Sequence, residues 1–407
     1  MNLELHLAKR IVFGNDGQSA SKPVIKIALF SVAVGLAVML IALMMVEGFQ
    51  NEITKKVTGF GGHIILGNFT SNQSYELEPL DKSKVNLLLV KNTPHVTHVQ
   101  EFATKASIIK TKDEIQGIIL KGVGTDFNWS FIKDNLVAGT LPQYAEGGKS
   151  DEILISAVLV KMLKLKLGDN VFCYFIEGNE QLIRRFKITG IYNTGFEEID
   201  NQFVMCDIAH IRKLNDWQPD QTGSYEILID NFNYLDETAQ AVYSAAGSAM
   251  NVRTIKDDYP QIFSWLILID TNVYIIIGLM LIVASINMIS TLLIIILENT
   301  SQIGILKALG ATNMQIRKVF FYVSIYLMVG GMLLGNFLGI GLATLQYVFH
   351  FIKLQQDTYY IAYAPVAFSV TKIVLLNLGT MLVCIIVLLL PALVVSRIQP
   401  IKAIRFE

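Results

Sequence analysis

Long apolar runs alternate with polar stretches along this chain of 407 residues. A helix needs about 20 predominantly apolar residues to cross a bilayer. Four runs reach that length, at residues 27–46, 273–297, 319–349 and 373–395. The mixed polar stretch 47–272 separates the first run from the second. The pattern therefore predicts one membrane-spanning helix, a large α+β domain outside the membrane, and then three more spanning helices.

The second span is expected to begin well before its apolar run. Apolar residues recur at the i, i+3, i+4, i+7 spacing of a helix, at Tyr259, Ile262, Phe263 and Leu266. If 257–297 is one helix, its length at 1.5 Å per residue is roughly 60 Å, about twice the hydrocarbon core of a bilayer. The first span continues in the same way, with an apolar stripe at Val46, Phe49, Ile53 and Val57. We predict that both helices project outward and pack as a stalk.

The large domain shows two strand–helix–strand patterns around a middle portion. The first is predicted at 63–66, 81–91 and 96–111, and the second at 225–229, 234–246 and 251–254. The middle portion, about 117–221, is expected to be an inserted subdomain with a helix and a hairpin, at 156–163, 171–176 and 182–192.

Basic residues near the span ends predict the orientation, because they favour the cytoplasmic side. They gather before the first span, after the second and after the fourth, at Lys9, Arg10, Lys22, Lys26, Lys307, Arg317, Lys318, Arg397, Lys402 and Arg405. Both termini are therefore expected in the cytoplasm. Leu3, Leu7 and Ile11 predict a short helix on the inner membrane surface. The first span is either an uncleaved anchor or a signal peptide, and its length favours the anchor.

Composition agrees with a membrane protein, since 52% of residues are hydrophobic and 16% charged. The formal net charge of −1 argues against a nucleic-acid partner. Cys384 lies in the fourth span. Cys173 and Cys206 lie in the large domain, either as a disulfide or, as we favour, as two buried thiols.

Motifs typical of catalysis or metal binding are incomplete in this chain. Gly148-Lys149-Ser150 is the nearest approach to a phosphate-binding loop, but Gln143 stands where its first glycine belongs. His95 and His98 lack a third ligand in the pattern. We therefore predict no catalytic residue and no metal site.

Glycines recur every four residues in the third span, at Gly331, Gly335 and Gly339. Such a face allows two helices to approach closely, and we assign it to helix packing.

A short helix is predicted in the polar turn after the second span. Thr300 or Ser301 can cap its start, Gly310 can end it in the left-handed conformation, and Thr312 with Gln315 resembles a capping box for the third span. Its apolar residues are expected to be exposed and either to dock on a partner or to lie on lipid headgroups: Ile303, Ile305, Leu306 and Leu309.

Several of these stretches resemble one family. Residues 302–311, which read Gln-Ile-Gly-Ile-Leu-Lys-Ala-Leu-Gly-Ala, resemble the coupling helix of ABC-transporter permeases, among them the macrolide exporter with its MacB-like periplasmic domain and the FtsX-like proteins. Within that superfamily the chain most resembles the lipoprotein-releasing (Lol) permeases. The matching motifs run along nearly the whole chain, at 47–52, 122–126, 152–156, 167–169, 188–191 and 391–407.

The resemblance implies a multi-pass permease of the bacterial inner membrane, with its large domain in the periplasm. It implies a cytoplasmic ATPase dimer as partner, which binds ATP and Mg so that this chain needs no cofactor, and a second permease copy or paralogue. The segments are then 1–22 (cytoplasmic tail with interfacial helix), 23–57 (first span and stalk), 58–256 (periplasmic α+β domain), 257–297 (stalk and second span), 298–318 (cytoplasmic coupling helix), 319–349 (third span), 350–372 (short periplasmic loop), 373–396 (fourth span) and 397–407 (cytoplasmic tail).

The resemblance also implies the function: mechanical extraction of lipoproteins from the membrane. The residues expected to couple to the ATPase are Gln302, Ile303, Gly304, Ile305, Leu306, Lys307, Ala308 and Gly310. Those expected either to contact lipoprotein acyl chains or only to pack the stalk are Met45, Phe49, Ile53, Phe263, Leu266 and Ile269.

Two departures from the family pattern leave alternatives open. The coupling turn lacks the arginine and glutamate that many members carry. One Lol paralogue grips a periplasmic lipoprotein chaperone with a long hook, whereas 176–182 is expected here to be a tight turn, so a chaperone partner stays open. The rival functions are a signal relay of the FtsX type and efflux of a macrolide or peptide.

Overall fold

The computed structural model describes residues 3–13, 21–69, 75–145, 148–177, 180–247, 249–355 and 359–394. The chain forms two compact units. We call the first the membrane unit, which comprises Met1–Asn51, Trp265–Lys353 and Tyr363–Glu407. The second is the outer unit, which comprises Glu52–Ser264 and Leu354–Ala362.

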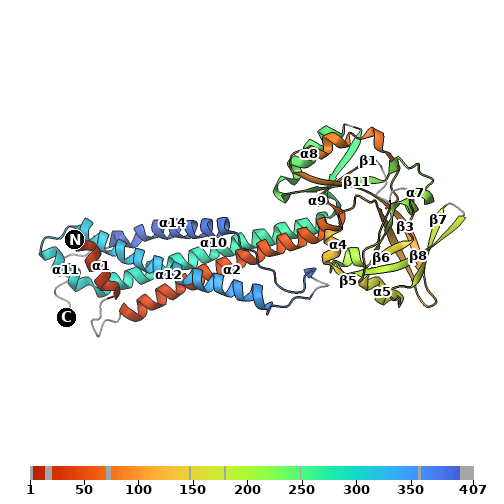
Figure 1. Cartoon of the computed structure of the whole chain (residues 1–407). Helices are drawn as coiled ribbons and strands as arrows, with labels where there is room; N and C mark the ends of the chain where they lie inside the picture. The colour runs from red at the N-terminus through yellow and green to blue at the C-terminus, as the bar shows by residue number, and fades with distance from the viewer. Residues whose placement is uncertain are drawn as a thin grey trace. The chain divides into compact units, whose positions relative to one another are not determined.

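Four helices among the described residues are long and apolar enough to cross a membrane. They run beside one another in the membrane unit (Figure 1): α2 (Ser21–Gly61), α10 (Pro260–Glu298), α12 (Asn313–Phe349) and α14 (Val370–Val394). Each contains one of the four predicted spans, so the predicted membrane fold is confirmed. Two short helices accompany them, α1 (Leu3–Phe13), which packs on α12, and α11 (Thr300–Ala308). The C-terminal motif beyond residue 394 lies outside the described residues.

The helix of the second span begins later than the predicted residue 257. A separate turn, α9 (Ile255–Asp258), comes first and is started by a capping box between Thr254 and Asp257. The backbone of Tyr259 then leaves the helical region, with φ −124° and ψ 56°. The reason is Pro260, which disfavours the helical conformation in the residue before it but suits the first position of a helix.

Six strands of the outer unit form a closed barrel. In order of pairing they are β3 (Val96–Lys110), β4 (Ile115–Val123), β9 (Phe203–Asp207), β6 (Glu152–Ser156), β8 (Glu180–Tyr192) and β7 (Asn170–Glu177), and β7 pairs back onto β3. Apolar side chains fill the interior, among them Ile109, Leu120, Phe175, Phe186 and Cys206. The predicted β7–β8 hairpin is confirmed up to the pair Glu177 and Glu180, and residues 178–179 lie outside the described part.

The same sheet continues past β3 on its other side. The added strands are β11 (Ser224–Ile229), β1 (Ile64–Asn68) and β12 (Met250–Thr254), with β5 (Leu136–Gly139) at the far edge beside β8. The middle portion of the domain therefore shares one sheet with its flanks (Figure 1). A second small sheet joins β2 (Leu80–Asp81) to β10 (Gln221–Thr222).

Short helices connect these strands. They are α3 (Leu87–Lys91), α4 (Ser130–Asp134), α5 (Ala157–Leu163), α6 (Glu197–Asp200), α7 (Ile208–Leu214), α8 (Leu235–Ala246) and the 3-10 turns η1 (Lys82–Lys84) and η2 (Phe232–Tyr234). The helix predicted at 81–91 is wrong in its first half. Asn86 accepts a hydrogen bond from the Leu89 amide and starts α3, so only the residues after it are α-helical.

Candidate functional site

The short helix α11 is the most specific feature of the sequence. Asn299 stands at its N-cap position, so the prediction of Thr300 or Ser301 is wrong, but the Asn299 side chain makes no capping bond and donates instead to the Ile295 carbonyl. The Thr300 hydroxyl instead donates to the Leu297 carbonyl at 2.6 Å and satisfies the end of α10. Gly310 has φ +96° and ends α11 in the left-handed region, as predicted.

The predicted capping box at the start of α12 is confirmed. The Thr312 hydroxyl accepts from the Gln315 amide at 3.3 Å, and the Gln315 side-chain oxygen accepts from the Thr312 amide at 2.9 Å. With Gly310, this box makes α11 a separate short helix held between α10 and α12.

The apolar residues of α11 face two ways. Ile303 is only 2% exposed and packs in a cluster with Ile295, Ile316 and Phe320, so its predicted exposure is wrong. Gly304 is also buried, and Leu306 and Lys307 are half-buried. The remaining residues of the predicted coupling set are exposed: Gln302, Ile305, Ala308 and Gly310.

Three large apolar side chains stand out on the exposed side. Ile305 is 51% exposed, Leu309 is 80% exposed and Met314, at the start of α12, is 62% exposed. We call these three residues the α11 face. Met314 was missed from the sequence because it lies beyond the glycine that ends α11. Large exposed apolar side chains so close in sequence offer a surface that a protein partner can bury.

The glycines of the third span pack against α2, as predicted. A Cβ atom on Gly331 would lie 2.8 Å from the Cβ of Val32, and one on Gly335 would lie 2.8 Å from the Ala33 carbonyl oxygen. Gly339 meets Ala37 and Leu40 at 3.1 Å. The three glycines therefore hold the two helices at a separation that larger residues cannot reach.

Amide side chains join the helices elsewhere in the membrane unit. Asn287 of α10 donates to the Ser31 hydroxyl of α2, whereas Ser290 donates to the Ile286 carbonyl of its own helix. A reciprocal pair between α12 and α14 was not predicted from the sequence. There, Asn336 and Asn377 exchange hydrogen bonds of 2.7 and 3.0 Å.

The candidate acyl-contacting residues differ in exposure. Ile53 is fully buried, Leu266 is 4% exposed and Phe263 is 8% exposed. Met45, Phe49 and Ile269 are half-buried and keep part of their surface open. The large apolar side chains that α10 exposes most in this region were not predicted: Ile267, Leu268, Tyr274 and Ile275.

The outer unit holds two cysteines and two histidines that lie close together in the sequence. Cys173 and Cys206 are free buried thiols, which is the favoured alternative, and burial raises the pKa of Cys173 to about 12. The His95 ring lies 3.0 Å from the Asp230 carboxylate, and the His98 ring bonds the Asp126 carbonyl at 2.7 Å.

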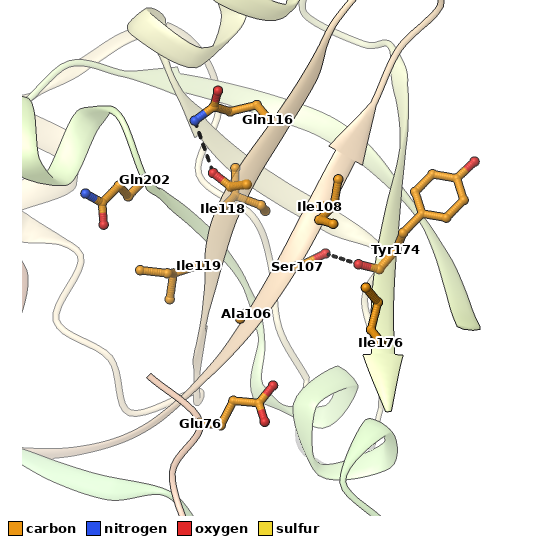
Figure 2. A pocket seen from close by; sticks show the side chains of 11 residues that line it. Glu76, Ala106, Ser107, Ile108, Gln116, Ile118, Ile119, Tyr174, Ile176 and Gln202 are labelled. Atoms are coloured by element: carbon orange, nitrogen blue, oxygen red, sulfur yellow. Dashed lines mark hydrogen bonds between the residues drawn. The ribbon is translucent and has the colours of Figure 1, made fainter. Parts of the chain in front are cut away.

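A groove of about 560 Å³ crosses β3, β4 and β7 in the outer unit (Figure 2). The Ser107 hydroxyl donates to the Tyr174 carbonyl at 3.2 Å and joins two of these strands. The lining combines one carboxylate and two amides with aliphatic and aromatic side chains: Glu76, Gln116, Gln202, Ile108, Ile118, Ile119, Tyr174 and Ile176. This chemistry suits binding rather than covalent catalysis.

Comparisons with known proteins agree with this architecture. Residues 27–259 match the model of the MacB-like periplasmic core domain, and residues 274–400 match the model of the FtsX-like permease C-terminal region. The lipoprotein-releasing system transmembrane protein LolC of Neisseria meningitidis is 23% identical, over 94% of each chain. LolE of Haemophilus influenzae is 21% identical, over 98% of each chain. The solved periplasmic region of MacB from Actinobacillus actinomycetemcomitans aligns at 13% identity and a TM-score of 0.34, over 49% of this chain and 92% of that one.

Proposed function

Because the chain belongs to the FtsX- and MacB-like permeases of ABC transporters, we propose that it extracts lipoproteins from the bacterial inner membrane and releases them toward the outer membrane. Permease subunits of this family are not catalytic, and the chain is a multi-pass membrane protein with a periplasmic domain. ATP hydrolysis therefore belongs to a partner ATPase. In the proposal, a dimer of that ATPase binds ATP and Mg on the cytoplasmic side.

The length of the similarity carries the lipoprotein proposal. The LolC and LolE relatives match over 94% and 98% of this chain, so both the membrane helices and the outer domain have counterparts in them. A chain that shared only the periplasmic core with these relatives would support lipoprotein cargo far less.

The α11 face supports contact with the ATPase. Ile305, Leu309 and Met314 are all exposed, on or next to the turn that joins α10 to α12. In the proposal this turn and both chain termini are cytoplasmic, because basic residues gather near them. Closure of the nucleotide sites then moves α11, and α10 carries the displacement outward along its 39 residues, about 58 Å of continuous helix.

The cargo explains why ATP is required. Moving each CH₂ group of an acyl chain out of lipid costs about 0.8 kcal/mol, so several long acyl chains hold a lipoprotein firmly in the bilayer. In the proposal these chains enter between α2 and α10, beside the partly open side chains of Met45, Phe49 and Ile269. A second permease copy, identical or paralogous, encloses the cargo from the other side, and a soluble chaperone is the proposed acceptor.

The test is release of a defined cargo. The chain is purified with its ATPase, reconstituted in lipid nanodiscs and loaded with radiolabelled triacylated lipoprotein. Addition of ATP is expected to release the label to a soluble acceptor. The rate of ATP hydrolysis is expected to be higher when cargo is present. Vanadate-trapped complex is the control, because it binds nucleotide without turning over.

Two results would count against lipoprotein release. If ATP hydrolysis proceeds at a rate that cargo does not change, and no label leaves the nanodisc, the signal relay becomes the better assignment. If the label stays while a macrolide or peptide is exported, efflux replaces it.

A further inference from the structure

The loop between β8 and α6 is held rigidly by one buried carboxylate. Asp200 is 1% exposed and accepts hydrogen bonds from the Thr194 amide, the Thr194 hydroxyl and the Gly195 amide, at 3.2, 3.0 and 2.9 Å. The Ser156 hydroxyl donates to the Asp200 carbonyl. Gly195 has φ +65°, a conformation that glycine adopts without strain. We call residues 193–200, which comprise this loop and α6, the junction loop.

Three segments of the outer unit meet at this loop. The Lys56 ammonium of α2 donates to the Thr194 carbonyl at 2.7 Å. The ring of Tyr259, one residue before α10, meets the Phe196 ring edge-on at 6.1 Å. The Tyr360 ring, in the connection between α12 and α14, lies 4.9 Å from the same Phe196 ring.

A fourth contact, a hydrogen bond, also joins Tyr360 to the junction loop. The Tyr360 hydroxyl donates to the Glu198 carboxylate at 3.0 Å. Phe196 itself is completely buried between its neighbours. A fully packed aromatic ring leaves little free space, so a displacement on one side is passed to the other.

The three segments that contact the junction loop are also the ones that connect the two units. The chain passes between the membrane unit and the outer unit at residues 51–52, 264–265, 353–354 and 362–363. These passages belong to α2, to α10 and to the two ends of the segment Leu354–Ala362. Lys56, Tyr259 and Tyr360 stand on these same three connections, so each connection contacts the junction loop soon after it enters the outer unit.

We propose that the junction loop is where the helix movements driven by the ATPase enter the periplasmic barrel, with Phe196 and Tyr360 as its positioning residues. The inference rests on the proposed function in assuming a partner ATPase, but it is independent of the cargo. The junction loop follows directly on β8, so a displacement of Phe196 is delivered directly to a barrel strand.

The test measures movement without cargo. Nitroxide labels are attached to Met162→Cys on α5 and Leu342→Cys on α12, whose native side chains are 41% and 47% exposed. The three native cysteines are buried and should not compete for label. Double electron–electron resonance then measures the distance between the two labels in the full chain with its ATPase. The distance is measured first without nucleotide and then with vanadate-trapped ADP.

We expect a shift in the distance when the junction is intact. Phe196→Ala and Tyr360→Ala should reduce that shift at least twofold. For Tyr360→Ala the rate of ATP hydrolysis and the melting temperature should stay close to those of the unmodified chain, whereas Phe196→Ala also lowers the melting temperature because it empties a buried site. Tyr360→Phe, which loses only the bond to Glu198, should reduce it less. Tyr243→Ala is the matched control, because Tyr243 is a 40% exposed aromatic residue on α8.

Two results would overturn the proposal: no nucleotide-dependent shift in the intact chain, or a full shift in Tyr360→Ala. Because Tyr360 lies outside the barrel, that variant keeps the test decisive even where Phe196→Ala does not fold. If no lipoprotein is released but the shift still depends on the junction loop, only the assignment of lipoprotein as cargo is rejected. If lipoprotein is released and both variants keep the full shift, only the role of the junction loop is rejected.

Discussion

Lys121 on β4 and Glu226 on β11 form an ion pair inside the outer unit. Their side chains are 2.6 Å apart and no more than 3% exposed. Gln100 donates to the other Glu226 oxygen at 2.8 Å. The Lys121 ammonium also donates to the Phe60 carbonyl in the last turn of α2 and lies 4.5 Å from the Phe60 ring. A buried cation at the carboxyl end of a helix dipole thus fastens α2 to the sheet.

Breaking this pair should be costly. Lys121→Met leaves the Glu226 carboxylate buried without its cation, so we expect the free energy of unfolding of the outer unit to fall by about 3–5 kcal/mol. Urea unfolding followed by tryptophan fluorescence measures the loss. The double variant Lys121→Met with Glu226→Leu removes both charges and should recover most of it. A double variant as unstable as the single one would disprove the argument.

His210 should make the outer unit sensitive to mild acid. Burial, with the nearby Lys149 charge, lowers its pKa from 6.5 to about 4, so the unfolded chain takes up a proton between those values and the folded chain does not. Stability therefore falls as pH drops through this window. A pKa lowered by this much can reduce the free energy of unfolding by at most about 3 kcal/mol at low pH.

His210→Gln removes the titrating ring but can still donate to the Ser150 carbonyl, which His210 contacts at 2.9 Å. Between pH 7 and pH 5, the variant should lose about 1–2 kcal/mol less stability than the unmodified chain. Urea midpoints at the two pH values measure this difference. Equal losses in both proteins would show that His210 carries no part of the acid sensitivity.

For single residues, the sequence shows which side chains carry charge or can donate hydrogen bonds, but it seldom shows which residue each one contacts. The sequence places His95 and His98 close together, but nothing near them in sequence indicates Asp230 as a neighbour of His95. Lys121 lies in an ordinary apolar strand, and its partner is more than a hundred residues away. Such pairs depend on the register between β3, β4 and β11, which local periodicity does not determine.

Among the helices, the contact between α2 and α12 offers the sharpest test. Gly335→Leu would push a side chain into the Ala33 backbone, which cannot move aside as a flexible side chain can. We expect a loss of about 1–3 kcal/mol from overpacking, seen as a lower melting temperature in detergent. Gly341→Leu is the control on the same helix, because a Cβ atom at Gly341 would have no neighbouring atom within 4 Å. Equal effects of both changes would contradict close packing at Gly335.

The long helices were predictable because each carries a strong local pattern. The β7–β8 hairpin and the Thr312 capping box are also local and were found. The errors arose where one residue overrode the pattern. Pro260 delayed the start of α10, Asn86 divided the predicted helix at 81–91, and the inward orientation of Ile303 depended on neighbouring helices.

At the scale of the whole molecule, docking on the ATPase should depend on the α11 face. Leu309→Glu places a charge on its most exposed apolar residue, and we expect at least a tenfold loss of affinity, or about 1.4 kcal/mol, for the partner ATPase. Co-purification and ATPase stimulation in nanodiscs measure it. Leu5→Glu on α1 is the control, because Leu5 is an exposed leucine outside this face. Unchanged ATPase binding by Leu309→Glu would show that docking uses another surface.

The global arrangement was the least predictable part. Barrel closure requires β7 to return to β3, where Ile108 pairs with Tyr174, and no local signal indicates so distant a pairing. The role of the segment Leu354–Ala362 was missed for the same reason, since its Tyr360 contacts residues of α6 and the loop before it.

Because β7 is held by β3 and β8 is held by β6, the barrel does not rely on the connection between Glu177 and Glu180 to stay closed. Lengthening the connection between two strands that are held in this way adds little energetic cost. Related chains can therefore gain or lose long hairpin extensions during evolution without refolding the domain beneath them. An epitope tag or a small affinity module spliced at the same point would be displayed on an intact scaffold.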